Sequence, residues 1–272
     1  MNQLNGNVEE AHPSLRVIFG LIFSGIILAI FVTLTAKIVY PSIQLVLGEV
    51  FIIVPAVAYI VLKKYHFRNV FRLYKIEKNV VVVSAILAIS LTILSDEIDR
   101  IISTFVKLSP EFEELISRML KADTFTEWVV LFASAVILAG VIEEMLFRGL
   151  LLKALEKRVE VTSAIFFSAL IFAFAHPVPW FIQVLILGFI LGYMTWRSNS
   201  IFPSIILHSV NNAFALIFNN VDPAKVSWYT WNGHVYPPIV AIAACITFYG
   251  FKWFIRTTEK GEEVHEYGKT NT

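Results

Sequence analysis

The sequence predicts an all-α protein, a polytopic transmembrane bundle of about eight helices. The first observation is composition: of 272 residues, 57% are hydrophobic and 16% are charged, which is typical of a membrane protein. The second is that the apolar residues gather in runs close to the roughly 20 residues that a spanning helix needs. These runs cover residues 15–36, 41–62, 79–95, 127–152, 161–176, 180–196, 200–218 and 236–255.

The charges between these runs predict the orientation of the chain in the membrane. Lysine and arginine fill the second connection, residues 63–78, and the fourth, residues 153–158, whereas the third connection mixes cations with many acids. Because basic loops stay on the cytoplasmic side, we expect the even-numbered connections and both termini to be cytoplasmic. The chain then has one transmembrane domain, residues 15–256, between cytoplasmic tails at residues 1–14 and 257–272.

Composition also excludes several classes of protein. The formal net charge is +1 and the cations are scattered, so no concentrated basic face is available to bind nucleic acid. The single cysteine, Cys245, excludes an intramolecular disulfide framework and a cysteine-based metal site. The N-terminal residues lack a basic region before a short apolar core and a cleavage site, so we predict no cleaved signal peptide.

The third connection predicts an additional, amphipathic helix. Ser109 is a suitable N-cap, and Pro110 suits the first helical position. Apolar side chains then recur at helical spacing, and such a helix is expected to lie on the outer membrane surface. These side chains are Phe112, Leu115, Ile116, Met119 and Leu120.

Ionisable and strongly polar side chains are rare inside the apolar runs. An ionised group at bilayer depth costs a few kcal/mol or more, so such residues usually face a protein interior or a wet cavity and serve a function. Each of these residues is therefore a candidate for a site. The set is Glu49, Glu143, Glu144, Arg148, His176, His208, Asn211 and Asn212.

The adjacent acids Glu143 and Glu144 are predicted to have different partners. Glu144 and Arg148 are four residues apart, so they lie on one helical face and should form an ion pair. Glu143 is rotated by about 100° from Glu144 and cannot share that cation equally. One carboxylate is thus neutralised and the other remains for chemistry, unless both acids merely lie at the cytoplasmic rim of the membrane.

His176 is predicted to lie beside Glu143. It ends an apolar run and is followed by Pro177 and Pro179, which end a regular helix. If the fourth and fifth runs form an antiparallel hairpin about residues 158–161, Glu143 and His176 lie at the same depth, each roughly 16 residues from the bend. A carboxylate and an imidazole side by side can deprotonate a water, as in general base hydrolysis, although a histidine at a helix end also serves for packing or capping.

His208 and Asn212 are a second pair at helical spacing. They are four residues apart in the seventh run and project from the same face. Two N–H donors aimed at one point would stabilise the oxyanion of a tetrahedral intermediate. Hydrogen bonding between helices, a common use of polar residues in membranes, is the alternative.

Three segments carry a resemblance to a known family. They read Glu-Glu-Met-Leu-Phe-Arg at residues 143–148, Phe-Ala-Phe-Ala-His at 172–176 and His-Ser-Val-Asn-Asn at 208–212. In this order, within apolar runs, they resemble the motifs of the type II CAAX prenyl endopeptidases. That family is part of the wider family of CAAX proteases and bacteriocin-processing enzymes, which are intramembrane glutamate proteases.

The resemblance implies a metal-independent peptidase that removes the C-terminal tripeptide from a prenylated CAAX protein or peptide. Carried over to this sequence, Glu143 and His176 activate water, His208 and Asn212 form the oxyanion site, and Glu144 and Arg148 support them. No metal or other cofactor is implied. The implied fold is a helical bundle with a cavity open to the cytoplasm and to lipid, in the cell membrane of a prokaryote or the endoplasmic reticulum membrane of a eukaryote.

Other functions remain open from the sequence. Members of the wider family that act in bacteriocin maturation or immunity share the motifs. Glu143, His176 and His208 could instead be zinc ligands of a membrane protease, although the sequence lacks an HExxH motif. A transporter or binding protein would also use intramembrane acids and histidines, although no inverted repeat is evident. Glu49 has no predicted partner and is assigned to packing, outside the site.

Overall fold

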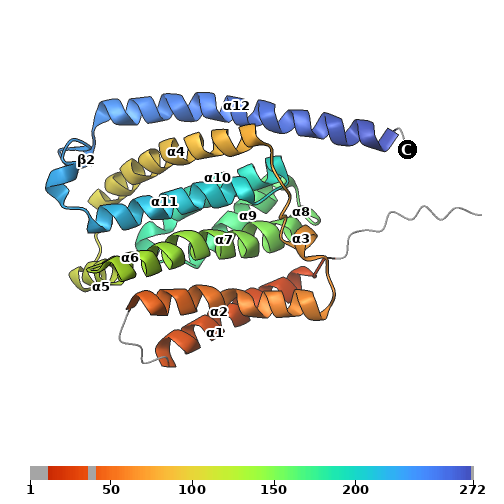
Figure 1. The fold of residues 1–272 in the computed structure, drawn as a ribbon, viewed down its shortest axis with the longest axis horizontal. Coiled ribbons are helices and arrows are strands. Elements are labelled where there is room, and N and C mark those ends of the chain that lie inside the picture. Colours follow the sequence, from red (N-terminus) through yellow and green to blue (C-terminus); the bar gives the residue numbers. More distant parts are fainter. Residues whose placement is uncertain (1–11, 36–40, 271–272) are drawn as a thin grey trace, which may run out of the picture.

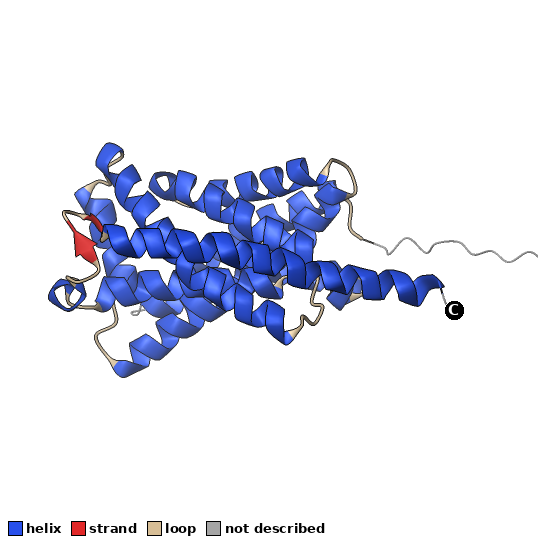
Figure 2. Ribbon diagram, turned by 90° about the horizontal axis from the view of Figure 1, so that it is seen from above, coloured by secondary structure: helices blue, strands red, loops and turns tan. Residues whose placement is uncertain are grey.

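The computed structural model describes residues 12–35 and 41–270, with side chains except at positions 41, 42 and 259–270. Its long helices run side by side along the molecule, with α12 along one edge and the α1–α2 pair along the other (Figure 1). Figure 2 shows that helices make up almost the whole described chain. The long helices are α1 (Leu15–Thr35), α2 (Pro41–Leu62), α4 (Lys78–Phe105), α9 (Val161–Phe174), α10 (Phe181–Ser198), α11 (Phe202–Asn220) and α12 (Pro237–Thr270).

A composite helix runs through the middle of the bundle and carries both adjacent acids. It begins after a capping box formed by Thr124 and Glu127 and continues without a break to Glu156. Two of its five segments are π-helical, a rare conformation that often accompanies functional sites. The segments are α6 (Phe125–Leu131), η1 (Phe132–Leu138), α7 (Ala139–Glu144), η2 (Met145–Leu152) and α8 (Lys153–Glu156).

Short elements connect the long helices at the two ends of the bundle. The basic connections, with α3 and the turn after α8, lie at one end, whereas α5 and the β-hairpin lie at the other (Figure 1). The two strands pair antiparallel, Thr230 with Val235. The short elements are α3 (Phe67–Val70), α5 (Pro110–Leu120), η3 (Val178–Trp180), η4 (Pro223–Val226), β1 (Thr230–Trp231) and β2 (His234–Val235).

The all-α prediction is confirmed, and all eight predicted runs lie in helices. Within the described residues, six helices are long and apolar enough to cross a membrane: α1, α2, α4, the composite helix, α10 and α12. The other two runs form α9, which has 14 residues, and α11. His208 lies on α11, and His176 lies two residues after the end of α9.

Some predicted boundaries differ from the structure. Helix α4 continues to Phe105, ten residues beyond the predicted end at 95, because its charged last turns hold the β-hairpin: Asp96 accepts from Tyr229, and Glu97 accepts from the backbone of Val235. Helix α12 continues through the predicted C-terminal tail to Thr270. Residues 1–11 of the predicted N-terminal tail and residues 271–272 lie outside the described residues.

The predicted amphipathic helix is present as α5. Ser109 accepts a hydrogen bond from the Phe112 backbone, as an N-cap does. Phe112 lies with its ring centroid 6.1 Å from that of Trp180, at the tip of the α9–α10 hairpin. Asn220 donates to the carbonyl of Leu120, which ties the end of α5 to the end of α11. Helix α5 therefore covers the end of the bundle at which α9 stops.

Two large apolar clusters form most of the core, and a smaller third joins the composite helix to α11 around Leu131, Val136 and Leu216. One large cluster joins α1, α2, α7, η2 and α9 and includes Leu146 and Phe172. The other large cluster joins α4, α10, α11 and α12 and includes Leu207. Gly140 brings the two sides together, because a Cβ at this position would collide with Ser209 on α11. Close approach at Gly140 places the acids of α7 against the polar face of α11.

Candidate active site

Glu144 and Arg148 form the predicted ion pair. Arg148 Nη1 donates to Glu144 Oε1 at 2.8 Å, and both side chains are fully buried. Arg148 Nη2 donates to the carbonyl of Gly188 on α10 at 3.2 Å. A Cβ at Gly188 would lie 3.3 Å from that nitrogen, so glycine leaves room for the guanidinium. Hydrogen bonds from both ends of Arg148 thus fix Glu144 in the core.

Glu144 has a second partner that the sequence did not reveal. His208 Nδ1 lies 3.0 Å from the same oxygen, Glu144 Oε1. An ionised carboxylate only accepts, so Nδ1 carries a proton, and Nε2 on the other side of the ring presents a lone pair when the ring is neutral. Glu144 therefore sets the tautomer of His208, a role beyond support of the helix.

Glu143 lies between two imidazoles. His176 Nε2 and His208 Nε2 are each 3.8 Å from Glu143 Oε2. This distance is too long for a direct hydrogen bond and suits a bridging water. His176 donates from Nδ1 to the carbonyl of Phe172 at 2.9 Å, so its Nε2 also presents a lone pair when the ring is neutral. The structure thus places Glu143 beside His176, as the hairpin geometry predicts, and adds His208 on the other side.

Phe172 lies among the charged and titratable groups. Its ring centroid is 4.1 Å from Arg148 Cζ, 4.6 Å from the His176 ring and 5.8 Å from the His208 ring. The ring face supports the guanidinium, and its contacts hold both imidazoles edge-on. Sequence analysis did not single out Phe172, although its place four residues before His176, on the same helical face, was a usable signal.

Asn212 lies differently from the expectation of two converging donors. Its Nδ2 donates to the carbonyl of Ala135, in the π-helical segment η1, at 2.9 Å. His208 Nδ1 is bound to Glu144, and Asn212 Nδ2 is bound to Ala135. These two donors therefore do not point at one common site. A carboxamide has two N–H donors, and a protonated His208 also donates from Nε2. Asn212 therefore joins α11 to η1 and retains one further donor.

Glu49, assigned to packing from the sequence, lies on α2, which packs against both η1 and α7 of the composite helix. One oxygen, Glu49 Oε2, is buried and makes no hydrogen bond within the described residues. The assignment of Glu49 to packing stays a prediction.

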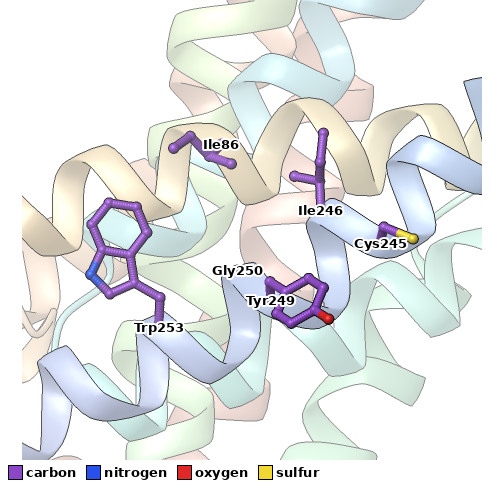
Figure 3. Close-up of a pocket in the computed structure, with 6 residues that line it drawn as sticks. All are labelled: Ile86, Cys245, Ile246, Tyr249, Gly250 and Trp253. Carbon is purple, nitrogen blue, oxygen red and sulfur yellow. The ribbon is translucent and has the colours of Figure 1, made fainter.

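A hollow in the structure lies away from the polar groups of the candidate site. It has a volume of about 290 Å³ and lies between Ile86 on α4 and a stretch of α12, as Figure 3 shows. Cys245, Tyr249 and Trp253 line it, with no carboxylate and no histidine. Its apolar walls suit the acyl chains of surrounding lipid and do not suit hydrolytic chemistry.

The proposed zinc ligands do not form a metal cluster in this structure. Within residues 12–35 and 41–270, no group of three or more histidine, cysteine, aspartate or glutamate side chains is placed to hold a metal ion. Glu143, His176 and His208 do approach one another through their Oε2 and Nε2 atoms.

Residues 125–214 match the family model described as type II CAAX prenyl endopeptidase Rce1-like. The chain therefore contains an Rce1-like domain. The match runs from the composite helix into α11 and includes Glu143, Glu144, Arg148, His176 and Asn212. Searches of curated proteins and of solved structures gave no match.

The Rce1-like domain confirms the resemblance seen in the motifs. Together with the six apolar helices, the match supports a multi-pass membrane protein that contains a domain similar to a peptidase family. Glu49 lies outside the matched residues.

Proposed function

We propose that the protein is an intramembrane endopeptidase that removes the C-terminal tripeptide from prenylated CAAX proteins, using water activated by Glu143 and His176. The position of Glu143 Oε2, 3.8 Å from two imidazole nitrogens, carries this proposal. These three atoms surround a volume in which a water can donate to the carboxylate and to an imidazole lone pair. The Rce1-like domain supports the substrate class.

Hydrolysis follows from the donors and acceptors of the site. Glu143, aided by His176 Nε2, accepts a proton as the water oxygen attacks the peptide carbonyl carbon. The carbonyl oxygen then carries the negative charge. When the tetrahedral intermediate collapses, the C–N bond breaks and the proton passes from Glu143 to the leaving amine. The tripeptide leaves with a neutral amine, and the prenylated product has a new carboxylic acid, which releases its remaining proton to water and becomes a carboxylate.

The oxyanion is stabilised by His208 and Asn212 in this mechanism. The second N–H of Asn212 is available beside its bond to Ala135. His208 donates from Nε2 only when its ring is doubly protonated, with Nδ1 bound to Glu144. Glu144 thus influences the oxyanion site, while the Glu144–Arg148 pair holds the composite helix against α10.

The membrane placement belongs to the same proposal. The substrate's prenyl chain stays in the bilayer or in an apolar groove, and its peptide reaches the polar residues within the bundle. We place the termini and the basic end of the bundle in the cytoplasm by the positive-inside rule. The protein then lies in the cell membrane of a prokaryote or the endoplasmic reticulum membrane of a eukaryote.

A cleavage assay with product mapping tests the proposed function. Purified protein in proteoliposomes is incubated with a farnesylated CAAX peptide and with the same peptide lacking the lipid, and the products are identified by mass spectrometry. We expect loss of three C-terminal residues from the lipidated peptide only. Glu143→Gln should remove this activity, whereas Glu160→Gln, an exposed acid before α9, serves as the matched control.

Two outcomes would overturn the assignment. Stoichiometric zinc, whose removal by a chelator abolishes cleavage, would replace general base catalysis by a metal mechanism. Solute movement into the proteoliposomes without cleavage of either peptide would favour a transporter.

A further inference from the structure

Ser168 is a buried polar residue that the proposed mechanism does not use. It lies on α9, its side chain is fully buried, and its hydroxyl donates to the carbonyl of Phe147 at 2.9 Å. A serine or threonine within a helix often donates to a carbonyl of its own preceding turn, as Thr33 and Thr258 do here. Ser168 donates instead to the backbone of the composite helix, so its hydroxyl acts on a helix other than its own.

Phe147 belongs to η2, one of the two π-helical segments on either side of α7. A π turn holds one residue more than an α turn, because each N–H bonds to the carbonyl five residues earlier, as Ala139 does to Ser134 in η1. A side chain that bonds into the backbone ladder of a helix is a known cause of irregular turns. The other π-helical segment accepts such a bond as well, from Asn212 on α11. Each segment is thus held by a side chain of a neighbouring helix.

Two glycines fix the rotation of the composite helix on either side of the adjacent acids. A Cβ at Gly140 would collide with Ser209 on α11, and a Cβ at Gly149 would lie 2.8 Å from Phe71 Cα. The residues next to each glycine carry a Cβ, so neither glycine can exchange places with a neighbour by rotation of the helix. The extra residue of a π turn then moves only along the helix between the two glycines, and each residue that it passes turns by about 100°.

Glu143 and Glu144 lie in this stretch, directly before η2. The angle between two successive residues of a helix is the same 100° that separates these two carboxylates. A π turn that moved past them would turn Glu144 away from Arg148 and His208, which are its partners in the present arrangement. The position of the π turn therefore decides which acid faces the imidazoles.

One face of α9 contacts the site along its length. Ser168, Phe172 and His176 are each four residues apart, so they project from this face. In this order they approach the backbone of η2, the guanidinium of Arg148 and the carboxylate of Glu143. Ser168 is the member of this face that bonds to the backbone of the composite helix, which is the part of that helix that a moving π turn changes.

We propose that Ser168 is a positioning residue that holds the π turn of η2 at Phe147 and thereby keeps Glu143, rather than Glu144, towards the two imidazoles. The effect on cleavage rests on the proposed function, whereas the orientation of the two acids is a property of the fold. Ser168 takes no part in the proton transfers. Without its hydroxyl the π turn moves towards the acids, and Glu144 loses its contact with His208.

Nitrogen-15 magnetic resonance of labelled histidine tests the orientation without any activity. The spectra are recorded on the full chain in bilayers, they report which nitrogen of an imidazole carries the proton, and His208→Gln assigns the signal of His208. In the wild type we expect the proton on His208 Nδ1. Ser168→Val should move it, whereas Ser168→Thr, which has the shape of valine and retains a hydroxyl, should keep the wild-type signal.

Ser90→Ala is the matched control for both measurements. Ser90 is also a buried serine in a hydrogen bond between helices, because its hydroxyl on α4 accepts from Thr247 on α12. Its loss weakens a helix contact outside the composite helix. We expect Ser90→Ala to keep the wild-type signal of His208, so that a general loosening of the bundle is distinguished from movement of the π turn.

Steady-state cleavage of the farnesylated peptide is the second measurement. Misplacement of a catalytic group by about 1 Å lowers the rate by about 10². We therefore expect Ser168→Val to lower kcat by about that factor with little change in KM, and Ser168→Thr to retain most of the wild-type kcat. A role in packing alone would lower the unfolding temperatures of both variants and would not separate them in kcat or in the His208 signal.

The outcomes separate this inference from the proposed function. If the wild type cleaves no lipidated peptide, the proposed function fails, and the His208 signal still decides the role of Ser168. A wild-type His208 signal in Ser168→Val overturns the inference, and so do equal kcat values of the threonine and valine variants. If the larger side chains prevent folding, Ser168→Ala takes the place of Ser168→Val, and an unchanged His208 signal in it overturns the inference in the same way.

Discussion

Glu143 and Glu144 are neighbours in sequence and differ in almost every physical respect. Glu144 has no exposed side-chain surface and accepts from both Arg148 and His208, whereas the Glu143 side chain is 16% exposed and lies 3.8 Å from two imidazoles. The rotation of about 100° between successive helical residues produces the difference. Glu144 faces the packed core, and Glu143 faces the partly open side of the helix.

This difference shows how a membrane enzyme can hold a reactive carboxylate. Glu144 Oε1, which accepts from Arg148 and lies against His208 Nδ1, fixes the helix and the tautomer of His208, so that Glu143 lies beside two imidazole nitrogens without a direct hydrogen bond to either. A direct hydrogen bond to Glu143 would reduce its basicity. The spacing of 3.8 Å keeps the carboxylate close to both rings but available to water.

The largest expected effect is on the rate of cleavage and comes from substituting Glu143 alone. We expect Glu143→Gln to lower kcat/KM by about 10² to 10⁴, the usual contribution of a general base. The unfolding temperature of this variant should stay near that of the wild type, because the substitution leaves no buried charge without its ion-pair partner. Peptide cleavage and thermal unfolding check this, and a wild-type rate would remove Glu143 from the mechanism.

Removing the ion-pair partner of Glu144 should mainly lower the free energy of unfolding. Arg148→Met leaves Glu144 as a buried charge that keeps only its His208 contact, and the loss of one partner of a buried ion pair costs about 3 to 5 kcal/mol. The double variant Glu144→Leu/Arg148→Met should recover much of that loss while remaining inactive. Reversible unfolding in detergent micelles measures both free energies. Equal stability of Arg148→Met and the wild type would contradict the assignment of Glu144 and Arg148 as the structural side of the site.

Asn212→Ala removes the carboxamide that is proposed to donate to the oxyanion. Loss of one oxyanion donor typically lowers kcat by about 10² to 10³, whereas the lost helix–helix hydrogen bond to Ala135 costs only about 0.6 kcal/mol of stability. We therefore expect a large change in kcat with a small change in unfolding temperature. If only stability changes, Asn212 is a connection between α11 and η1, and the oxyanion is bound elsewhere.

The smallest effect should come from Gly188→Ala, which crowds the guanidinium of Arg148 and leaves Glu143 unchanged. Its Cβ would lie 3.1 Å from the Ala169 side chain and 3.3 Å from Arg148 Nη2, so we expect about 1 to 3 kcal/mol of destabilisation by overpacking. Gly20→Ala is the matched control, because nothing lies within 4 Å of that position and a helical alanine is more stable than glycine. Thermal unfolding of both variants distinguishes local crowding from a general effect of the substitution.

The parts of the site that depend on one helix or one short turn could be predicted from the sequence. The Glu144–Arg148 spacing determined an ion pair, and the bend after α8 placed Glu143 level with His176. The contact of His208 with Glu144 could not be predicted, because it depends on the close approach of α7 and α11 at Gly140. The same holds for the Asn212–Ala135 bond, which involves a π-helical segment.

The composite helix and α9 also differ in length, and this has a consequence in a real bilayer. Thirty-two residues of helix rise about 48 Å, well beyond the roughly 30 Å of hydrocarbon, whereas α9, with 14 residues, rises about 21 Å and stops short of the far boundary. The two helices are aligned by the turn at residues 157–160 that joins them. Changes of membrane thickness can be absorbed by tilt of the longer helix near its α6 end. The registry of Glu143 with His176 is therefore set by a covalent connection and is largely independent of hydrophobic mismatch.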